Sequence, residues 1–327
     1  MKIQASLLAG LIAAAPGAAL MAQDTVEVAT DPVGYVSVDM TGASDTRIAV
    51  PMHRAPSFQG IPESVDGNSI NFPEGAGITP EASAYFIAVR SGDLAGLRAT
   101  VLDVTNDGDT LVVDDAVDLS GLAVGEGGDS VQLIAHWTLG SLFPEFPDET
   151  ELFVYDRGDA AGVDLAPSDI FTHFEGAWFD ENFNPADDRV VLLGESMIVR
   201  DSVGDDFTAV IAGSVPMFPV RDSLATIAAD TQQDTALGFA VPAPIRVGDI
   251  EGAQDNDELF IPDNVQTGID KAPAEILTSF GGEWFDENFA PADDHELVPG
   301  EGYIFRKAAT DSPQSDVIVY TPSYLNE

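Results

Sequence analysis

An internal repeat constrains the fold of this chain more than any other feature of its sequence. The 15 residues 174–188 recur almost unchanged at 280–294, and both copies contain the motif Trp-Phe-Asp-Glu-Asn-Phe-x-Pro-Ala-Asp-Asp. The similarity continues without a gap into 193–200 and 299–306, which share a Gly-Glu pair and a final Arg. Chance does not produce such an identity at constant spacing, so we expect two structurally related units.

Weaker matches upstream of the motif suggest where each unit begins. Glu151-Leu-Phe-Val matches Glu258-Leu-Phe-Ile, and Asp129-Ser opens an apolar run as Asp234-Thr does. A fainter echo, Asp45-Thr-Arg-Ile-Ala-Val-Pro, lies near the N-terminus. The expected segments are a signal peptide at 1–22, an N-terminal β region at 23–128, repeat unit 1 at 129–204, a connecting segment at 205–233, repeat unit 2 at 234–310 and a C-terminal tail at 311–327.

Short apolar runs bounded by turn residues predict an all-β chain with a few short helices, in sandwich- or barrel-like units. The Asn-Asp-Gly-Asp turn at 106–109 predicts a hairpin of 99–104 with 110–114. Two short helices are expected at 166–174 and 272–280, because each begins near a Pro and ends before a Gly. Further strands are expected at 35–39, 130–136, 151–155, 190–200, 237–241 and 303–307.

The N-terminus has the pattern of a secretory signal peptide. Lys2 supplies a positive charge, and an apolar, Ala-rich run at 7–20 follows it. Cleavage is expected after Ala22, or after Ala19, which fits the small-residue rule better. The alternative is an uncleaved anchor, but the run is short for crossing a bilayer. We expect an exported protein in the periplasm, at the cell surface or outside the cell, without a transmembrane segment in the mature chain.

Acidic residues dominate the charge of the chain. Asp and Glu total 56 against 13 Lys and Arg, which gives a formal net charge of −43. No nucleic-acid partner is expected, because phosphate contacts need clustered Lys and Arg. The absence of Cys excludes disulfides, thiol catalysis and thiolate metal sites. The acidity is typical of a surface that stays hydrated in high salt, and the alternative is abundant binding of divalent cations.

Four phrases resemble a paralogous family of secreted proteins of unknown function from verrucomicrobial genomes. They are Thr30-Asp-Pro-Val-Gly-Tyr-Val at the expected mature N-terminus, Leu119-Ser-Gly-Leu-Ala-Val-Gly, Trp137-Thr-Leu-Gly-Ser-Leu-Phe-Pro and Pro299-Gly-Glu-Gly-Tyr-Ile-Phe-Arg. The resemblance implies export and a repeated β-rich architecture. It implies no activity, cofactor or catalytic residue.

One acidic segment has the spacing of a calcium loop. Oxygen-bearing side chains stand at positions 1, 3, 5, 7 and 12 with Gly at position 6, a pattern that suits a cation taking six to eight oxygens. Position 12 is Asp rather than Glu, no flanking helix is evident, and the segment coincides with the expected hairpin. An acidic β-turn is therefore the alternative. The candidate calcium ligands are Asp103, Thr105, Asp107, Asp109 and Asp114.

The duplicated motif supplies a second set of candidates. Carboxylates near an aromatic ring suit a glycan or a cation, whereas buried Trp side chains with a polar turn between strands would serve only the fold. Duplication favours the structural alternative, because catalytic centres seldom appear twice in one chain. The candidate ligand-binding residues are Trp178, Asp180 and Asp187 in the first copy and Trp284, Asp286 and Asp293 in the second.

No catalytic signature is found. The four His residues (His53, His136, His173 and His295) have no metal-ligand spacing, and there is no nucleophile elbow, P-loop or dinucleotide fingerprint. We expect a non-enzymatic envelope or extracellular protein acting by surface association or display, with envelope components, matrix components or glycans as partners. The alternatives are a calcium-stabilised carbohydrate-binding module and, less favoured, a carboxylate-dependent glycoside-active enzyme.

Overall fold

The computed structural model describes residues 32–79, 84–155, 161–201 and 204–325. The expectation of an all-β chain is confirmed, because the described residues form 25 strands in seven antiparallel sheets and one α-helix of 4 residues. The sheets are sandwich-like, and none of those formed by the described residues closes on itself. The expected signal peptide at 1–22 lies outside the described residues.

None of the described helices is both long and apolar enough to cross a membrane. The helical segments are α1 (Leu139–Leu142), η1 (Asn106–Gly108), η2 (Val247–Asp249) and η3 (Ser323–Leu325).

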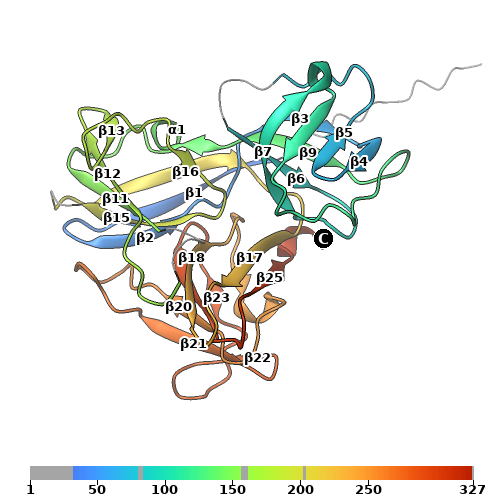
Figure 1. The fold of residues 1–327 in the computed structure, drawn as a ribbon. Helices are drawn as coiled ribbons and strands as arrows, with labels where there is room; N and C mark the ends of the chain where they lie inside the picture. Colours follow the sequence, from blue (N-terminus) through green and yellow to red (C-terminus); the bar gives the residue numbers. More distant parts are fainter. Residues whose placement is uncertain (1–31, 80–83, 156–160, 202–203, 326–327) are drawn as a thin grey trace, which may run out of the picture. The chain divides into compact units, whose positions relative to one another are not determined.

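Nine strands build the first copy of the repeated unit, which we call repeat 1. They are β1 (Val33–Met40), β2 (Asp45–Ala49), β10 (Trp137–Thr138), β11 (Thr150–Val154), β12 (Asp169–Phe174), β13 (Ala177–Asp180), β14 (Val190–Val191), β15 (Ser196–Asp201) and β16 (Phe207–Ser214). One sheet has the order β13-β12-β11-β15-β2, while β1 pairs with β16 and β10 with β14. Figure 1 shows the blue strands β1 and β2 beside the green and yellow strands of this unit, although they are far apart in sequence.

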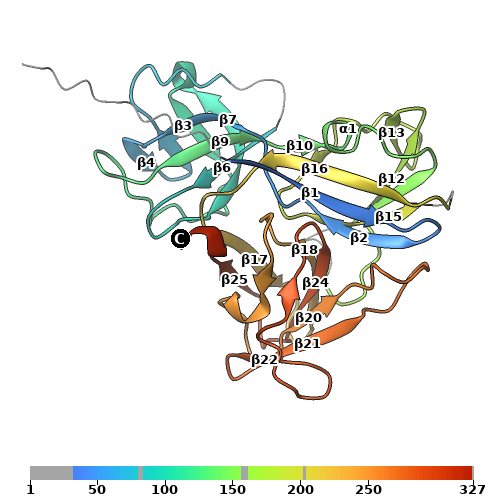
Figure 2. The same cartoon turned by 180° about the vertical axis from the view of Figure 1, so that it is seen from behind.

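Repeat 2 contains the same nine strands in the same chain order. They are β17 (Val220–Thr226), β18 (Gln233–Gly238), β19 (Ile245–Arg246), β20 (Glu258–Ile261), β21 (Glu275–Phe280), β22 (Glu283–Phe285), β23 (Glu296–Leu297), β24 (Gly302–Lys307) and β25 (Gln314–Tyr320). The sheet order β18-β24-β20-β21-β22 and the pairs β17-β25 and β19-β23 reproduce repeat 1 strand for strand. These strands are orange to red in Figure 2.

A seven-stranded sheet interrupts repeat 1, and we call it the inserted sheet. Its strands are β3 (Pro56–Gly60), β4 (Ser64–Asp66), β5 (Ser69–Asn71), β6 (Tyr85–Val89), β7 (Arg98–Thr105), β8 (Thr110–Val113) and β9 (Val131–Ala135). Their order in the sheet is β3-β9-β6-β7-β8-β5-β4. The sheet occupies the connection between β2 and β10, whereas the equivalent connection in repeat 2 spans only residues 239–244.

Strand pairing therefore places the repeats differently from the expected ranges 129–204 and 234–310. The strand of repeat 1 that is equivalent to β18 is β2, which begins at Asp45. The weak sequence match near the N-terminus therefore belongs to repeat 1. The segment beginning at Asp129 belongs to the inserted sheet. The expected connecting segment and tail supply the outer strands β16, β17 and β25.

The two expected helices are wrong. Residues 169–174 and 275–280 form β12 and β21, whose side chains are alternately buried and accessible. Phe171 and Leu277 point into the core at equivalent positions. The period of two in Ile-Phe-Thr-His-Phe and Ile-Leu-Thr-Ser-Phe outweighs the helix-start signal of the preceding Pro.

The expected hairpin of 99–104 with 110–114 is confirmed as β7 and β8. The expected strand at 190–200 is two strands, because a turn at residues 192–195 separates β14 from β15. The expected strand at 237–241 lies earlier, at β18. The shift follows from the pairing of β18 with β24, because β24 begins at Gly302, opposite Gly238.

The two repeats share one hydrophobic core, and the inserted sheet has its own. Every residue of β18 is buried, because one face of this strand meets its own core and the other meets repeat 1. Arg98 of β7 ties the inserted sheet to both repeats, since its guanidinium donates to the Leu193 carbonyl at 3.1 Å and pairs with Asp222 of β17.

The repeats contact each other through a self-complementary interface. The backbone bridge Ile48–Glu301 has its equivalent in Leu237–Glu195, with the roles of the repeats exchanged. Likewise the Ala49 amide donates to the Gly300 carbonyl at 2.8 Å, and the Gly238 amide donates to the Gly194 carbonyl at 2.9 Å. Such reciprocal contacts are those of a two-fold related pair, here within one chain.

Small residues make this close approach of the backbones feasible. A Cβ atom on Gly238 would collide with the Cβ of Ala49, its counterpart in the other repeat. A Cβ on Gly302 would collide with Ser196, again its counterpart. Each pair thus keeps one side chain and omits the other, because two would not fit.

We expect Gly238→Ala to lower the free energy of unfolding by about 2 kcal/mol through overpacking. Moving the methyl group instead of adding one, in Ala49→Gly/Gly238→Ala, should restore most of this loss. Urea unfolding of the two variants and the wild type measures both effects. A double variant no more stable than Gly238→Ala alone would contradict the proposed contact.

His136 provides a pH-dependent element next to the inserted sheet. The residue is buried, its ring centroid lies 4.8 Å from that of Phe86, and its Nδ1 has no hydrogen-bond partner among the described residues. Burial lowers the pKa of His136 to about 4, and the positive charge of Arg98 contributes to the same shift. The unfolded chain, with a pKa of 6.5 at this residue, therefore binds the proton first as the pH falls.

We expect the free energy of unfolding to fall by about 2 kcal/mol between pH 7 and pH 5 because His136 is protonated in the unfolded chain but not in the folded one. The loss should begin near the pKa of the unfolded state. Urea unfolding of the wild type and of His136→Gln at both pH values isolates this contribution, because Gln does not titrate. Equal pH dependence of the two proteins would show that His136 is not held neutral.

Candidate functional site

The acidic side chains of the duplicated motif are occupied by the backbone of their own loops. Oδ1 of Asp180 accepts hydrogen bonds from the amides of Asn182 and Asn184, both at 2.8 Å. In the second copy, Oδ1 of Asp286 accepts from the amides of residues 288 and 290, also at 2.8 Å. The bonds from Asn184, and the corresponding bond from residue 290, lower the pKa of these two carboxyl groups. The hydrogen bonds from loop amides to Asp180 and Asp286 thus form Asx turns.

The second pair of carboxylates holds the two Trp residues. Asp187 accepts a hydrogen bond from the Trp178 amide at 3.0 Å, and Asp293 accepts one from the Trp284 amide at 2.8 Å. The Trp side chains are 0% and 3% exposed, so neither can stack on a glycan. The structure brings the candidates of each copy together, but as a support for the loop.

The exposed rings of this motif belong to Phe residues that the sequence reasoning did not select. Phe183 and Phe289 occupy equivalent positions at the tips of the two loops and are 74% and 82% exposed. Their φ angles are 61° and 60°, so both residues adopt the left-handed conformation that is uncommon for a bulky side chain. In the sequence, the only signal for these two exposed rings is that the Phe is present in both copies of the motif.

The five candidate calcium ligands do not converge. Asp103 and Thr105 lie on β7, whereas Asp114 follows β8 and accepts from the amide of residue 116 at 2.9 Å. Asp109 accepts from the amides of residues 75 and 77, at 3.1 and 3.3 Å. Asp107 lies in the turn with φ 55°. The geometry fits the acidic-turn alternative, and calcium binding at these residues stays a prediction.

Across the part of the chain that the structure describes, no group of three or more His, Cys, Asp or Glu side chains is arranged to hold a metal ion.

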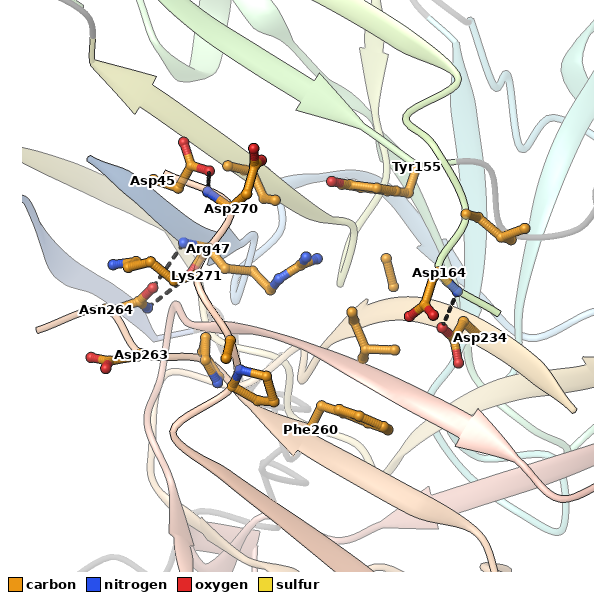
Figure 3. Close-up of a pocket in the computed structure, with 17 residues that line it drawn as sticks. Asp45, Arg47, Tyr155, Asp164, Asp234, Phe260, Asp263, Asn264, Asp270 and Lys271 are labelled. Atoms are coloured by element: carbon orange, nitrogen blue, oxygen red, sulfur yellow. Dashed lines mark hydrogen bonds between the residues drawn. The ribbon is translucent and has the colours of Figure 1, made fainter. Parts of the chain in front are cut away.

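A cavity of about 550 Å³ lies between the facing sheets of the two repeats. Strands β2 and β15 line it from repeat 1, and strands β18, β20 and β24 line it from repeat 2 (Figure 3). The sheets touch at Ala49 and Gly238 and separate toward Asp45 and Asp234, so the cavity is the wide end of the interface. None of the sequence-predicted candidates is among the described residues that line it.

An ion bridge closes one side of this cavity. Arg200 binds Asp45 of its own repeat through Nε and Nη2, at 2.7 and 2.9 Å, and also binds Asp270 of repeat 2 at 3.0 Å. The Asp270 amide in turn donates to Oδ2 of Asp45 at 2.9 Å. These bonds, from Asp45 above all, raise the pKa of Arg200. A loop of repeat 2 is thereby fastened to repeat 1.

The opposite side repeats the bridge with the roles exchanged. Arg306 binds Asp234 at 2.7 and 2.9 Å and Asp164 of repeat 1 at 3.2 Å. The Asp164 amide donates to Oδ2 of Asp234 at 2.8 Å. The guanidinium groups of the two bridges lie 4.6 and 4.5 Å from the ring centroids of Phe153 and Phe260. The bridges thus obey the two-fold relation of the interface.

Two cationic side chains of the cavity break that relation. Arg47 has Ala236 as its counterpart in repeat 2, according to the equivalent registers of β2 and β18. Its backbone is held by the Asn264 side chain, which accepts from the amide at 2.9 Å and donates to the carbonyl at 3.0 Å. Lys271 donates to the carbonyl of residue 266 at 2.7 Å. Burial lowers the pKa of both cations.

The Arg47 guanidinium has a free donor. It lies 5.2 Å from the ring centroid of Tyr155, and its Nη1 is buried without a hydrogen-bond partner among the described residues. The described lining contains no His, Cys or Ser. Besides Arg47, the titratable groups of the lining are five carboxylates, Tyr155 and Lys271. Sequence reasoning noted the echo at Asp45 but began repeat 1 at residue 129, so it did not compare Arg47 with Ala236.

Comparison of the chain with protein-family models, curated proteins and solved structures gives no match.

The ion bridges offer a matched pair of substitutions around a single guanidinium. We expect Asp45→Asn to lower the free energy of unfolding by about 2 kcal/mol, because it removes a buried, doubly bonded carboxylate. Asp270→Asn at the same Arg200 should cost less than about 1 kcal/mol, since Asp270 is 90% exposed. Urea unfolding compares them. Equal costs would show that Asp45 is not the anchor of the bridge.

Proposed function

We propose that the protein is exported and works without catalysis, by associating with a surface through the tips of its two duplicated loops. The proposed surface belongs to the cell envelope or the extracellular matrix, with glycans as one class of partner. Support for export comes from the signal-like pattern at 1–22 and the strongly acidic composition. Support for association comes from the two exposed Phe side chains.

The exposed Phe pair carries the proposal. A phenyl group in water contributes nothing to the hydrophobic core, and its burial against a partner is favourable. Each turn also fixes its Phe: the Phe183 amide donates to the Asp180 carbonyl, and the Phe289 amide donates to the Asp286 carbonyl, both at 2.9 Å. The rings are therefore presented by ordered turns, which lowers the entropic cost of binding.

A second exposed Phe lies on the neighbouring strand in each copy. Phe174 at the end of β12 is 42% exposed, and Phe280 at the end of β21 is 59% exposed. Exposed acidic residues, among them Glu181 and Glu287, surround the loop tips. Flat apolar rings beside hydrogen-bond acceptors suit a glycan, whose sugar rings present C–H faces and hydroxyl donors. The buried Trp residues would then only support the loops.

Two copies of one loop also permit bivalent attachment. When both loops reach the same extended surface, the second contact forms at a high effective concentration, and the apparent affinity exceeds that of one loop. Display of a repeated loop on an acidic, soluble body is consistent with a role in association rather than in turnover.

We expect the mature chain to cosediment with washed envelope fractions of its source cells, and Phe183→Ser/Phe289→Ser to abolish this binding. Each single variant should weaken it about tenfold or more, because bivalence is lost. Leu102→Ser is the matched control, since Leu102 is 63% exposed but lies on the inserted sheet. Unchanged sedimentation of the double variant would overturn the proposal.

Export is tested separately. We expect the full chain, produced in a Gram-negative host, to be released from the cytoplasm with an N-terminus at Gln23 or Leu20. Intact mass of the released protein identifies the cleavage site. An uncleaved chain that stays in the cytoplasm would contradict export while leaving surface association open to the sedimentation test.

A further inference from the structure

The cavity between the repeats contains a cation, Arg47, that has no charged equivalent in repeat 2. Repeat 2 has Ala236 where repeat 1 has Arg47, and the two strands otherwise pair in the same register. Repeat 2 forms the same sheet with an uncharged residue at this position, so the strand pairing itself does not require Arg47. Within repeat 1 the Arg47 guanidinium interacts with Tyr155, and this interaction leaves its Nη1 without a partner among the described residues.

The nearby carboxylates do not supply a partner for this cation. Asp45 and Asp234 each bind another guanidinium through both oxygens, in the bridges formed by Arg200 and Arg306. Their charges act on Arg47 only at longer range. Nη1 of Arg47 stays buried and unbonded among the described residues. A buried donor without a protein partner is unfavourable, and native structures satisfy such groups with an ordered water, an ion or a ligand.

The rest of the lining defines the shape and polarity of a ligand. Lys271 adds a second cation, at the position where repeat 1 has the apolar Leu165. Apolar side chains, among them Ile198, Phe260 and Ile304, form the walls. Apolar walls with positioned polar groups are the usual features of a small-molecule site. The polar groups here also include five carboxylates, those of Asp45, Asp164, Asp234, Asp263 and Asp270. Figure 3 shows the Arg47 side chain reaching toward the middle of the space and Lys271 beside the Arg47 backbone, with Phe260 at another side of the space.

We propose that this cavity binds a small organic anion, a carboxylate with an apolar body, whose carboxylate accepts a hydrogen bond from the Arg47 guanidinium. Lys271 contributes a second positive charge, and the apolar body packs against Phe260 and the two Ile side chains. Carboxylate is the matching group because guanidinium presents parallel donors to it. The exposed Asp164 and Asp270 at the sides of the cavity disfavour ligands with several negative charges.

The test uses three probes with one apolar body and different heads. They are 3-phenylpropionate, 3-phenylpropan-1-ol and 3-phenylpropylammonium, titrated calorimetrically into the mature chain at fixed ionic strength. We expect the anion to bind, the alcohol to bind at least tenfold more weakly, and the cation to show no heat of binding. No binding of the anion at millimolar concentration, or stronger binding of the cation, would overturn the proposal.

Substitution then locates the site. Arg47→Met keeps an unbranched side chain and removes the charge, and we expect it to weaken 3-phenylpropionate binding at least tenfold. Arg246→Met is the matched control, because Arg246 is half-exposed in repeat 2 and pairs with Asp249 outside the cavity. It should change binding less than twofold. Equal losses in the two variants would show an effect of net charge and overturn the assignment.

Thermal unfolding distinguishes a ligand-binding Arg47 from a merely structural one. We expect Arg47→Met to unfold at the same temperature as the wild type or higher, and only the wild type to be stabilised by 3-phenylpropionate. A lower unfolding temperature without a ligand effect in either protein would make Arg47 a counterion of the interface. If Arg47→Met fails to fold, the comparison of the acid with the alcohol on the wild type still decides.

The inference does not rest on the surface-association proposal. Phe183→Ser/Phe289→Ser should bind 3-phenylpropionate as the wild type does, and Arg47→Met should sediment with envelopes as the wild type does. Each proposal therefore fails by its own measurement.

Discussion

The two repeats meet through backbone atoms where β2 and β18 approach each other, and the rest of the structure depends on that contact. Ala49 and Gly238 face each other at equivalent positions, and their amides donate across the interface to Gly300 and Gly194. Side chains on both members would force the sheets apart. Because the contact is reciprocal, it fixes the position of each sheet against the other. It also buries both faces of β18, whose residues are all buried.

The same alignment positions the cavity and its two ion bridges. From the tight contact the sheets diverge, and a loop of each repeat reaches over to the other, with Asp270 bound to Arg200 and Asp164 bound to Arg306. The bridges are equivalent, so they are explained by the duplication and the packing. Duplication does not explain the differences between the repeats, and the proposed ligand site rests on one of them, Arg47 at the position equivalent to Ala236. The proposal for the loops rests instead on a similarity between the repeats, because both copies have an exposed Phe, Phe183 or Phe289, at the same position.

The sequence predicted the fold class, the duplication and the hairpin, because each depends on patterns within a short window. It did not predict that the strand at Asp45 completes repeat 1, since the inserted sheet separates that strand from its neighbours in the chain. The helices expected at 166–174 and 272–280 failed for a related reason. Pro167 and Pro273 are local signals for the start of a helix, but the segments that follow them pair with β11 and β20 and form strands.

The candidate sites show the same limit of local reasoning. Asp180, Asp187 and their equivalents were identifiable as a polar cluster, but their bonding to loop amides depends on the folded turn. The five acids of the 103–114 segment matched a spacing, yet the hairpin directs them apart. The cavity was invisible in the sequence, because it is assembled from both repeats and becomes apparent only when β2 is matched with β18.

Amide hydrogen exchange of Ala49 and Gly238 tests the central claim most directly. Both amides donate across the repeat interface, to the carbonyls of Gly300 and Gly194 at 2.8 and 2.9 Å. We expect both amides to exchange only with global unfolding and as slowly as the core amides of β15 and β24. Fast exchange at Ala49 and Gly238, while the core amides of each repeat stay protected, would show that the repeats do not dock in this way.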